Sequence, residues 1–381
     1  MKQCWRWFGP DDPIDLGDLH QVGVQGIVTA LHHFSPGVVW PKAEISKRIA
    51  RLKANGFKWD VVESLPVSET IKTQGSDYKG HIAAYKTSLE HLAAAGVETV
   101  CYNFMPILDW TRTTLRARRD HGGTAMLFDL VDFAVFDLHL LRRAGASEDY
   151  DAALQEAAKR RHDDMSDQDK AQLQQNIVAG LPGANDTWSV EDVRQSLSTY
   201  DGINADRLRG NLIDFLSQVA PLAESLGLRL CCHPDDPPFP LLGLPRVMSS
   251  LEDYVKVTDA VDLPANGVTL CTGSLGVVPS FDPVAFIAAL GGRIHFAHLR
   301  NTKRIESMDN MRPNFFEAAH LEGDTEQSRR QAAGRPDWQI PMRPDHGQEL
   351  LGDLGGHSTP GYPLIGRLRG LAELRGIMAA C

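Results

Sequence analysis

The chain has 381 residues, of which 43% are hydrophobic and 23% are charged, and its formal net charge is −10 at pH 7. This composition is typical of a globular protein, and the length allows one barrel domain with insertions or two smaller domains. The acidic charge argues against general binding to nucleic acid or to anionic membranes, so an anionic ligand would need a local basic cluster.

Three further features concern location. The chain has no run of about eighteen apolar residues, so we expect no membrane span. The segment Met1 to Trp7 lacks the apolar stretch of a signal peptide. The six cysteines stand singly or as the adjacent pair Cys231 and Cys232, without the pattern of a disulfide framework. This use of cysteine favours a reducing cytoplasm.

Short apolar runs of strand type alternate with helical patterns along the chain. The eight predicted strands cover residues 3–7, 26–31, 59–63, 97–104, 228–232, 267–270, 293–297 and 340–342. The predicted helices cover residues 43–55, 81–95, 208–226, 251–257, 283–290 and 362–380. Continuous apolar runs are typical of parallel strands that are buried on both faces. Eight of them, alternating with helices, predict an α/β fold of the (β/α)8 TIM-barrel type.

The alternation stops between residues 111 and 205. We interpret this stretch as a mainly helical insertion within a single catalytic domain that spans residues 1–381. Mixed charge with helical periodicity at residues 147–170 predicts exposed helices. The stretch 301–337 is rich in Arg, Glu, Asp and Gln and is expected to be a long loop with some helix.

Four predicted strands end at a side chain that can bind a metal. These residues are His233, Cys271, His298 and Asp345. A single histidine or cysteine is more often a core or surface residue, and we assign Cys4, Cys101 and Cys381 to that class. A barrel, however, brings the carboxyl ends of its strands to one face. Two imidazoles, a thiolate and a carboxylate there form a first shell for a divalent transition metal.

Longer blocks of the sequence resemble the mannonate dehydratases of hexuronate degradation. The blocks lie between residues 4 and 377 and read CWRWFGPDDPI, TALHH, WDVVESLPV, CYNFMPILDWTRT, CCHPDDPP, HLRN, FFEAAHLEGD, IPMRPDHG and GYPLIGRLRGLAELRG. The resemblance implies a xylose-isomerase-like TIM barrel. It also implies a lyase dependent on Mn²⁺ or Fe²⁺ that removes water from D-mannonate to give 2-keto-3-deoxy-D-gluconate in hexuronate (glucuronate) catabolism.

The same resemblance assigns roles to residues. It makes His233, Cys271, His298 and Asp345 the metal ligands, and it places His346 and Tyr362 at positions of proton transfer. Dehydration needs one base for the proton beside the carboxylate and one acid for the departing hydroxyl, with a Lewis acid to stabilise the developing charge. Histidine can serve as either near pH 7. If these two residues failed, His32, His33 and His320 would be the next to test.

The anionic substrate also needs binding groups. Arg300, Asn301, Lys303 and Arg304 form a polar run just after His298. Arginine can hold a carboxylate through two parallel hydrogen bonds. The residues that we predict to bind the substrate are Arg300, Asn301, Arg343, Arg6, Glu63 and Asn103. Gly273 and Gly276 fit turn formation better than phosphate binding.

The chain departs from the family pattern in two places. Residue 348 is Gln where we expect His, and residues 325–339 form a short, Arg- and Gln-rich bridge where the family has a fuller helix. Two other functions remain open from the residues alone: a metal-dependent sugar isomerase or epimerase on the same barrel, and a structural zinc barrel that binds a sugar acid without turnover. The sequence also leaves open whether copies associate into a homo-oligomer.

Overall fold

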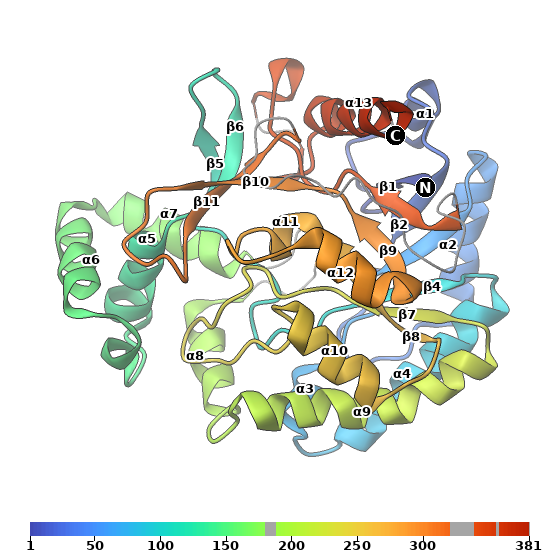
Figure 1. Cartoon of the computed structure of the whole chain (residues 1–381), viewed down its shortest axis with the longest axis horizontal. Helices are drawn as coiled ribbons and strands as arrows, with labels where there is room; N and C mark the ends of the chain where they lie inside the picture. The colour runs from blue at the N-terminus through green and yellow to red at the C-terminus, as the bar shows by residue number, and fades with distance from the viewer. Residues whose placement is uncertain (180–187, 321–338, 356–357, 381) are drawn as a thin grey trace.

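The barrel is the central feature of the computed structural model, which describes residues 1–179, 188–320, 339–355 and 358–380. Eight parallel strands close on themselves in the order β1-β12-β9-β8-β7-β4-β3-β2. Figure 1 shows this barrel within the whole chain. They are β1 (Lys2–Arg6), β2 (Gly26–Thr29), β3 (Trp59–Glu63), β4 (Thr99–Tyr102), β7 (Arg229–Cys232), β8 (Asn266–Cys271), β9 (Ile294–His298) and β12 (Pro341–Arg343). All eight predicted strands are present, and the TIM-barrel prediction is confirmed.

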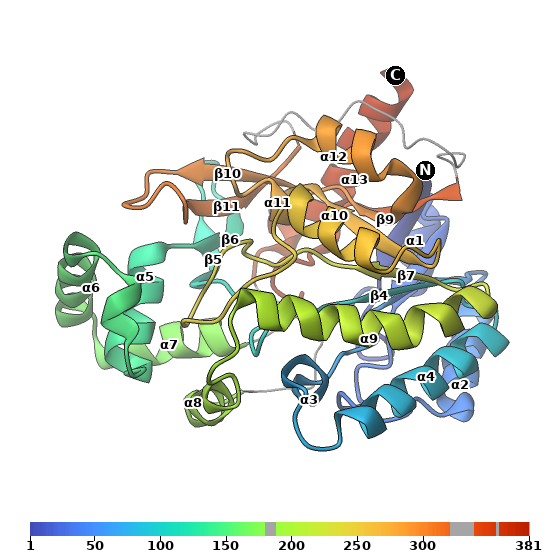
Figure 2. The same ribbon diagram turned by 60° about the horizontal axis from the view of Figure 1, so that its bottom comes forward.

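Helices surround the barrel. They are α1 (Leu16–Gln21), α2 (Lys42–Ala54), α3 (Glu69–Thr73), α4 (Tyr78–Ala94), α9 (Ala205–Ser225), α10 (Leu251–Ala260), α11 (Thr272–Leu275), α12 (Pro283–Leu290) and α13 (Leu364–Ala380). The long helix α9 runs along one side (Figure 2). It begins where the Asn204 side chain accepts a hydrogen bond from the Arg207 N–H, and its chain turns away at Gly227, whose φ is +70°. Among the described residues, no helix has the length and apolarity of a membrane span.

The barrel interior is filled by small and apolar side chains. One cluster joins residues of six strands: Cys4, Val28, Val61, Cys101, Cys231 and Phe296. Cys232 instead belongs to the larger core between the strands and the helices. The two adjacent cysteines therefore point to opposite faces of β7, as the two-residue period of a strand requires. The interior is a packed core, so chemistry is restricted to the barrel ends.

A second sheet stands beside the barrel and corrects one prediction. Residues 301–337 were expected to form a loop with some helix, but they supply β10 (Asn301–Ile305) and β11 (Asn314–Ala318). These strands join β5 (Thr114–Arg118) and β6 (Thr124–Phe128) in the antiparallel order β10-β11-β6-β5. The strands pair across about 190 residues of sequence, as Phe315 with Phe128 shows. Local sequence patterns do not reveal a strand whose partner lies so far away in the chain, so these two strands were not predicted.

The segment between residues 111 and 205 begins with β5 and β6 and continues as helices. These are α5 (Leu130–Val135), a π-helical turn (Phe136–Leu141), a 3-10 turn (Ala146–Asp149), α6 (Ala152–Asp164), α7 (Asp167–Val178) and α8 (Val190–Ser198). Two further 3-10 turns are Gly291–Arg293 and Leu351–Asp353. Helices α5 and α6 project at the left of Figure 1. The shortened bridge predicted at residues 325–339 lies, except for its last residue, outside the described residues.

Candidate functional site

Three predicted metal ligands converge at the carboxyl ends of neighbouring strands. The candidate ligand atoms of His233, Cys271 and His298 all lie within 4.8 Å of one another. His233 Nε2 is 3.0 Å from His298 Nδ1. The fourth candidate, Asp345, places Oδ2 3.7 Å from Cys271 Sγ and 4.0 Å from His298 Nδ1. Ligands at about 2.0–2.3 Å from one ion lie about 3–4 Å apart, so this donor set fits a single transition-metal ion.

The strand ends explain why these side chains meet. Cys271 and His298 are the last residues of β8 and β9, and they are paired in register. His233 directly follows β7, and Asp345 lies two residues beyond β12. Asp345 has a φ of +49°, in the left-handed region that aspartate enters more readily than most residues. This turn points the carboxylate back toward the neighbouring strand ends.

The electrostatics keep two of the candidate donors, Asp345 and His233, in their metal-binding forms. Burial alone would raise the pKa of Asp345, but Arg343, His346 and Arg300 hold it well below the ordinary value. Burial lowers the pKa of His233, against the opposing effect of nearby carboxylates. An ionised carboxylate and a neutral imidazole are the forms that bind metals.

A carboxylate lies behind the second histidine. Glu63 Oε2 is 3.5 Å from His298 Nε2, on the opposite side of the ring from His233. Arg343 donates to both oxygens of Glu63, at 2.9 and 2.6 Å, and Arg6 Nη1 donates to Oε1 at 2.6 Å. Arg343 also forms an ion pair with Asp345. At 3.5 Å the contact is longer than an ordinary hydrogen bond. A carboxylate at this position can still orient the ring of a metal-binding histidine.

The two residues predicted to transfer protons are hydrogen-bonded to each other. His346 Nε2 is 3.0 Å from Tyr362 Oη, and the rings meet edge to face. Burial lowers the pKa of His346 and raises that of Tyr362. Both groups are therefore neutral near pH 7, so together they offer hydrogen-bond donors and acceptors next to Asp345, the candidate metal-binding carboxylate.

A buried network of four charged residues holds His346 from the other side, and sequence reasoning missed three of them. Arg300 Nη1 is 2.5 Å from His346 Nδ1 and Nη2 is 2.9 Å from Asp236 Oδ2. Glu317 Oε1 is 3.3 Å from the same histidine nitrogen. Arg112 Nη2 pairs with both Asp236 and Glu317 at 2.8 Å. The three missed residues all lie in the family-like sequence blocks quoted above: Arg112, Asp236 and Glu317. Their charge, without an assigned role, was the one sign in the sequence that could have pointed to them.

Gly273 makes room for this network. A Cβ atom at this position would lie 1.9 Å from Arg300 Nε. Glycine is needed here because the Arg300 side chain passes directly over the backbone. The role of Gly273 is therefore close packing, and phosphate binding is not needed to explain it.

The remaining predicted residues lie around this centre. The Asn301 amide donates to the backbone oxygen of His320, and Asn103 lies 3.5 Å from Asp109. Lys303 is exposed, and Arg304 donates to the backbone oxygen of Gly276. Gln348, which stands where His was expected, donates to the backbone oxygen of Glu317. The binding roles proposed for Asn301 and Asn103 stay predictions.

Comparison with known proteins identifies the family. A family model described as D-mannonate dehydratase (UxuA) matches residues 1–381. The chain belongs to the D-mannonate dehydratase family. A mannonate dehydratase of Rhizobium meliloti (strain 1021) is 53% identical over 391 residues, covering 100% of this chain and 97% of the relative. One from Chromohalobacter salexigens is 50% identical, covering 100% and 98%.

A solved structure agrees with the family assignment. The crystal structure of mannonate dehydratase from Streptococcus suis serotype 2 superposes with a TM-score of 0.76 at 30% identity, covering 100% of this chain and 93% of that one. The chain is thus similar to a D-mannonate dehydratase along its whole length, and the convergent donor set lies in regions that the family match includes.

Proposed function

We propose that this enzyme catalyses the metal-dependent dehydration of D-mannonate to 2-keto-3-deoxy-D-gluconate and water, in hexuronate catabolism. The observation that carries the proposal is the placement of His346 and Tyr362 beside four converging metal-binding side chains on one face of the barrel. A sugar acid held there would present its C2 and C3 atoms to an acid–base pair.

The metal in this proposal is Mn²⁺ or Fe²⁺, held by His233, Cys271, His298 and Asp345. When bound, it acts as a Lewis acid toward the carboxylate and the 2-hydroxyl of the sugar acid and makes the C2 proton easier to remove. The mixed nitrogen, sulfur and oxygen donors suit a first-row transition metal better than Mg²⁺ or Ca²⁺. Glu63 orients His298, and Arg343 holds both Glu63 and Asp345 in place.

Proton transfer is assigned to His346 and Tyr362. One of the pair accepts the proton from C2, and the other donates a proton to the departing 3-hydroxyl, so that water leaves and the enol product becomes the 2-keto acid. Their 3.0 Å hydrogen bond lets the pair exchange a proton between turnovers. Arg300 and Glu317 fix the ring of His346 from its Nδ1 side.

Arg6 is the strongest of the predicted substrate-binding residues. Its Nη1 donates to Glu63, whereas its buried Nε and Nη2 have no hydrogen-bond partner within the described part of the chain. Buried donors of this kind are satisfied by a ligand or by water. Arg300, Asn301, Arg343, Glu63 and Asn103 would complete the polar surroundings, mainly by positioning their neighbours.

The wider predictions also belong here. We place the enzyme in the cytoplasm because the described cysteines are all unpaired and buried. We treat residues 111–205 as an insertion in one catalytic domain because Arg112, at its start, reaches the charge network of the site. Assembly into a homo-oligomer stays a prediction.

The test is anaerobic turnover of D-mannonate by the purified protein. After chelation and confirmation that no metal remains, we expect no 2-keto acid. Addition of Mn²⁺ or Fe²⁺ should restore its formation. Turnover that continues without metal would overturn the proposal, as would a metal-loaded protein that leaves D-mannonate unchanged. Conversion of an aldose to a ketose by the metal-loaded protein would favour the alternative hypothesis of a sugar isomerase.

A further inference from the structure

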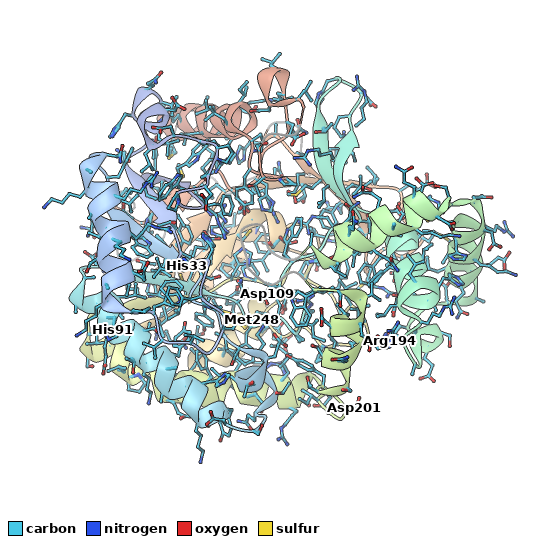
Figure 3. All side chains as sticks on the ribbon, turned by 180° about the vertical axis from the view of Figure 1, so that it is seen from behind. His33, His91, Asp109, Arg194, Asp201 and Met248 are labelled. Atoms are coloured by element: carbon cyan, nitrogen blue, oxygen red, sulfur yellow. The ribbon has the colours of Figure 1, made fainter. Side chains whose placement is uncertain are left out.

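A second feature of the barrel mouth is a pocket of about 300 Å³ that contains none of the predicted metal ligands. Its walls come from the carboxyl ends of β1 to β4: Arg6 ends β1, His32 follows β2, Ser64 follows β3, and Asp109 lies in the segment after β4. Figure 3 marks Asp109, and it marks His33, the neighbour of His32 in the chain.

The strand order divides the mouth into two halves. The metal-binding candidates come from β12, β9, β8 and β7, which are contiguous in the barrel, and the pocket comes from the contiguous strands β4, β3, β2 and β1. Arg6 belongs to both halves because it lines the pocket and donates to Glu63, which lies behind His298. Arg6 therefore links the pocket to the metal half, which makes the pocket the candidate site for the far end of a chain molecule held at the metal half.

The pocket holds buried nitrogen atoms without partners. Within the described residues, both ring nitrogens of His32 lack a hydrogen-bond partner, as do Nε1 of Trp40 and two nitrogens of Arg6. Burial, with the positive charges of Arg6 and Arg48, lowers the pKa of His32 to about 3, although the nearby backbone of Phe8 acts in the opposite direction. That backbone contact involves at most one ring nitrogen and leaves the other for a ligand. A neutral imidazole offers one donor and one acceptor, which is the pattern that a hydroxyl group matches.

Other charged groups of the pocket are already engaged. The buried Lys72 ammonium contacts Glu69 at 2.7 Å, Asp109 at 3.2 Å and the backbone oxygen of Met105 at 2.7 Å. Three contacts use all three of its hydrogens, so Lys72 fixes the wall. Phe8 packs between the two halves, 5.6 Å from the His32 ring and 4.8 Å from the Tyr362 ring. His32 thus lies one aromatic ring away from the residues assigned to chemistry.

We propose that this pocket binds the terminal polyol carbons of the sugar acid and that His32 is a specificity-determining residue that hydrogen-bonds the terminal hydroxyl. The inference rests on the proposed function, because it assumes that the carboxylate end of the substrate lies at the metal half. A substrate that lacks the terminal hydroxyl leaves the buried imidazole unpaired, and a site built for a hydroxyl rejects such analogues.

The test compares kcat/KM for D-mannonate with that for 6-deoxy-D-mannonate, which lacks only the terminal hydroxyl. The Mn²⁺-loaded wild type should prefer D-mannonate by about 10- to 100-fold, the effect of leaving one buried polar group without a partner. In His32→Ala this ratio should fall to within about threefold of unity, with metal content unchanged. His32→Gln, which keeps a donor and an acceptor, should restore part of the preference. The control is His33→Ala, because the His33 side chain is 54% exposed, and it should keep the wild-type ratio.

The outcomes separate the two proposals. A wild type that converts D-mannonate but does not discriminate against the deoxy analogue contradicts the role of the pocket, and this result needs no variant. A His32→Ala protein that keeps the wild-type ratio contradicts the role of His32. A wild type that converts neither compound overturns the proposed function itself.

Discussion

Replacing Arg112 with methionine should destabilise the protein strongly. The Arg112 side chain is fully buried, and its Nη2 lies 2.8 Å from both Asp236 and Glu317. Methionine refills most of the volume but leaves two buried carboxylates with less compensation. Removing one partner of a buried ion pair typically costs about 3–5 kcal/mol. Arg300 still contacts both carboxylates, so we expect the lower end of that range.

The effect should depend on pH with a defined sign. Burial alone would raise the pKa values of Asp236 and Glu317, but Arg112 and Arg300 hold both below their ordinary values. Carboxyl groups with lowered pKa values stabilise the fold above the pKa of the unfolded chain and lose that effect as the pH falls. The difference between wild type and Arg112→Met should therefore be largest at neutral pH and shrink below about pH 4.

Urea unfolding of the chelated proteins, followed by circular dichroism at pH 7 and at pH 3, measures both effects. Arg160→Met is the matched control, because Arg160 is 75% exposed and pairs with Glu156 on the surface of α6. The control should unfold at the urea concentration of the wild type. If Arg112→Met also unfolds there, or if its deficit grows as the pH falls, the account of the network is wrong.

Three other predictions concern the site and the barrel. His346→Asn and Tyr362→Phe should each keep the metal and the fold but lose about 10²–10⁴-fold in kcat. The variant that also loses exchange of the C2 proton with deuterated water lacks the base. Wild-type rates in both variants would contradict the assignment. Glu63→Gln should weaken Mn²⁺ binding about 10- to 100-fold in a calorimetric titration, and unchanged affinity would refute its role behind His298. Gly267→Ala should lower the free energy of unfolding, measured with urea, by about 1–3 kcal/mol, because the new Cβ would lie 2.1 Å from the His295 side chain. The control is Gly210→Ala, which has no neighbouring atom within 4 Å of the new Cβ and should be neutral or stabilising.

The barrel could be predicted from the sequence because parallel strands that are buried on both faces consist of short, continuous runs of buried residue types. Strand β8, for example, is buried at all six residues, and its β-branched and apolar residues Val268 to Leu270 lead directly to Cys271. The position of the candidate ligands followed from the same rule, since each stands where an apolar run gives way to a turn. Topology then brings together residues as distant in sequence as His233 and Asp345.

The second sheet and the charge network could not be predicted in this way. Strand β11 pairs with β6, so its existence depends on a partner far away in the chain. Likewise, the role of Glu317 depends on Arg112, Arg300 and His346, which come from three other segments. Local patterns carry information on periodicity and capping, whereas the pairing of buried charges depends on tertiary structure.

Titration of the chelated protein with Mn²⁺ tests the central claim most directly. The account predicts one site per chain in the wild type and in the exposed-histidine control His33→Ala. It predicts that Cys271→Ser and His298→Ala, which remove donors of the converging set, lose most of that binding while keeping the barrel fold by circular dichroism. One site of wild-type affinity in both ligand variants would contradict it.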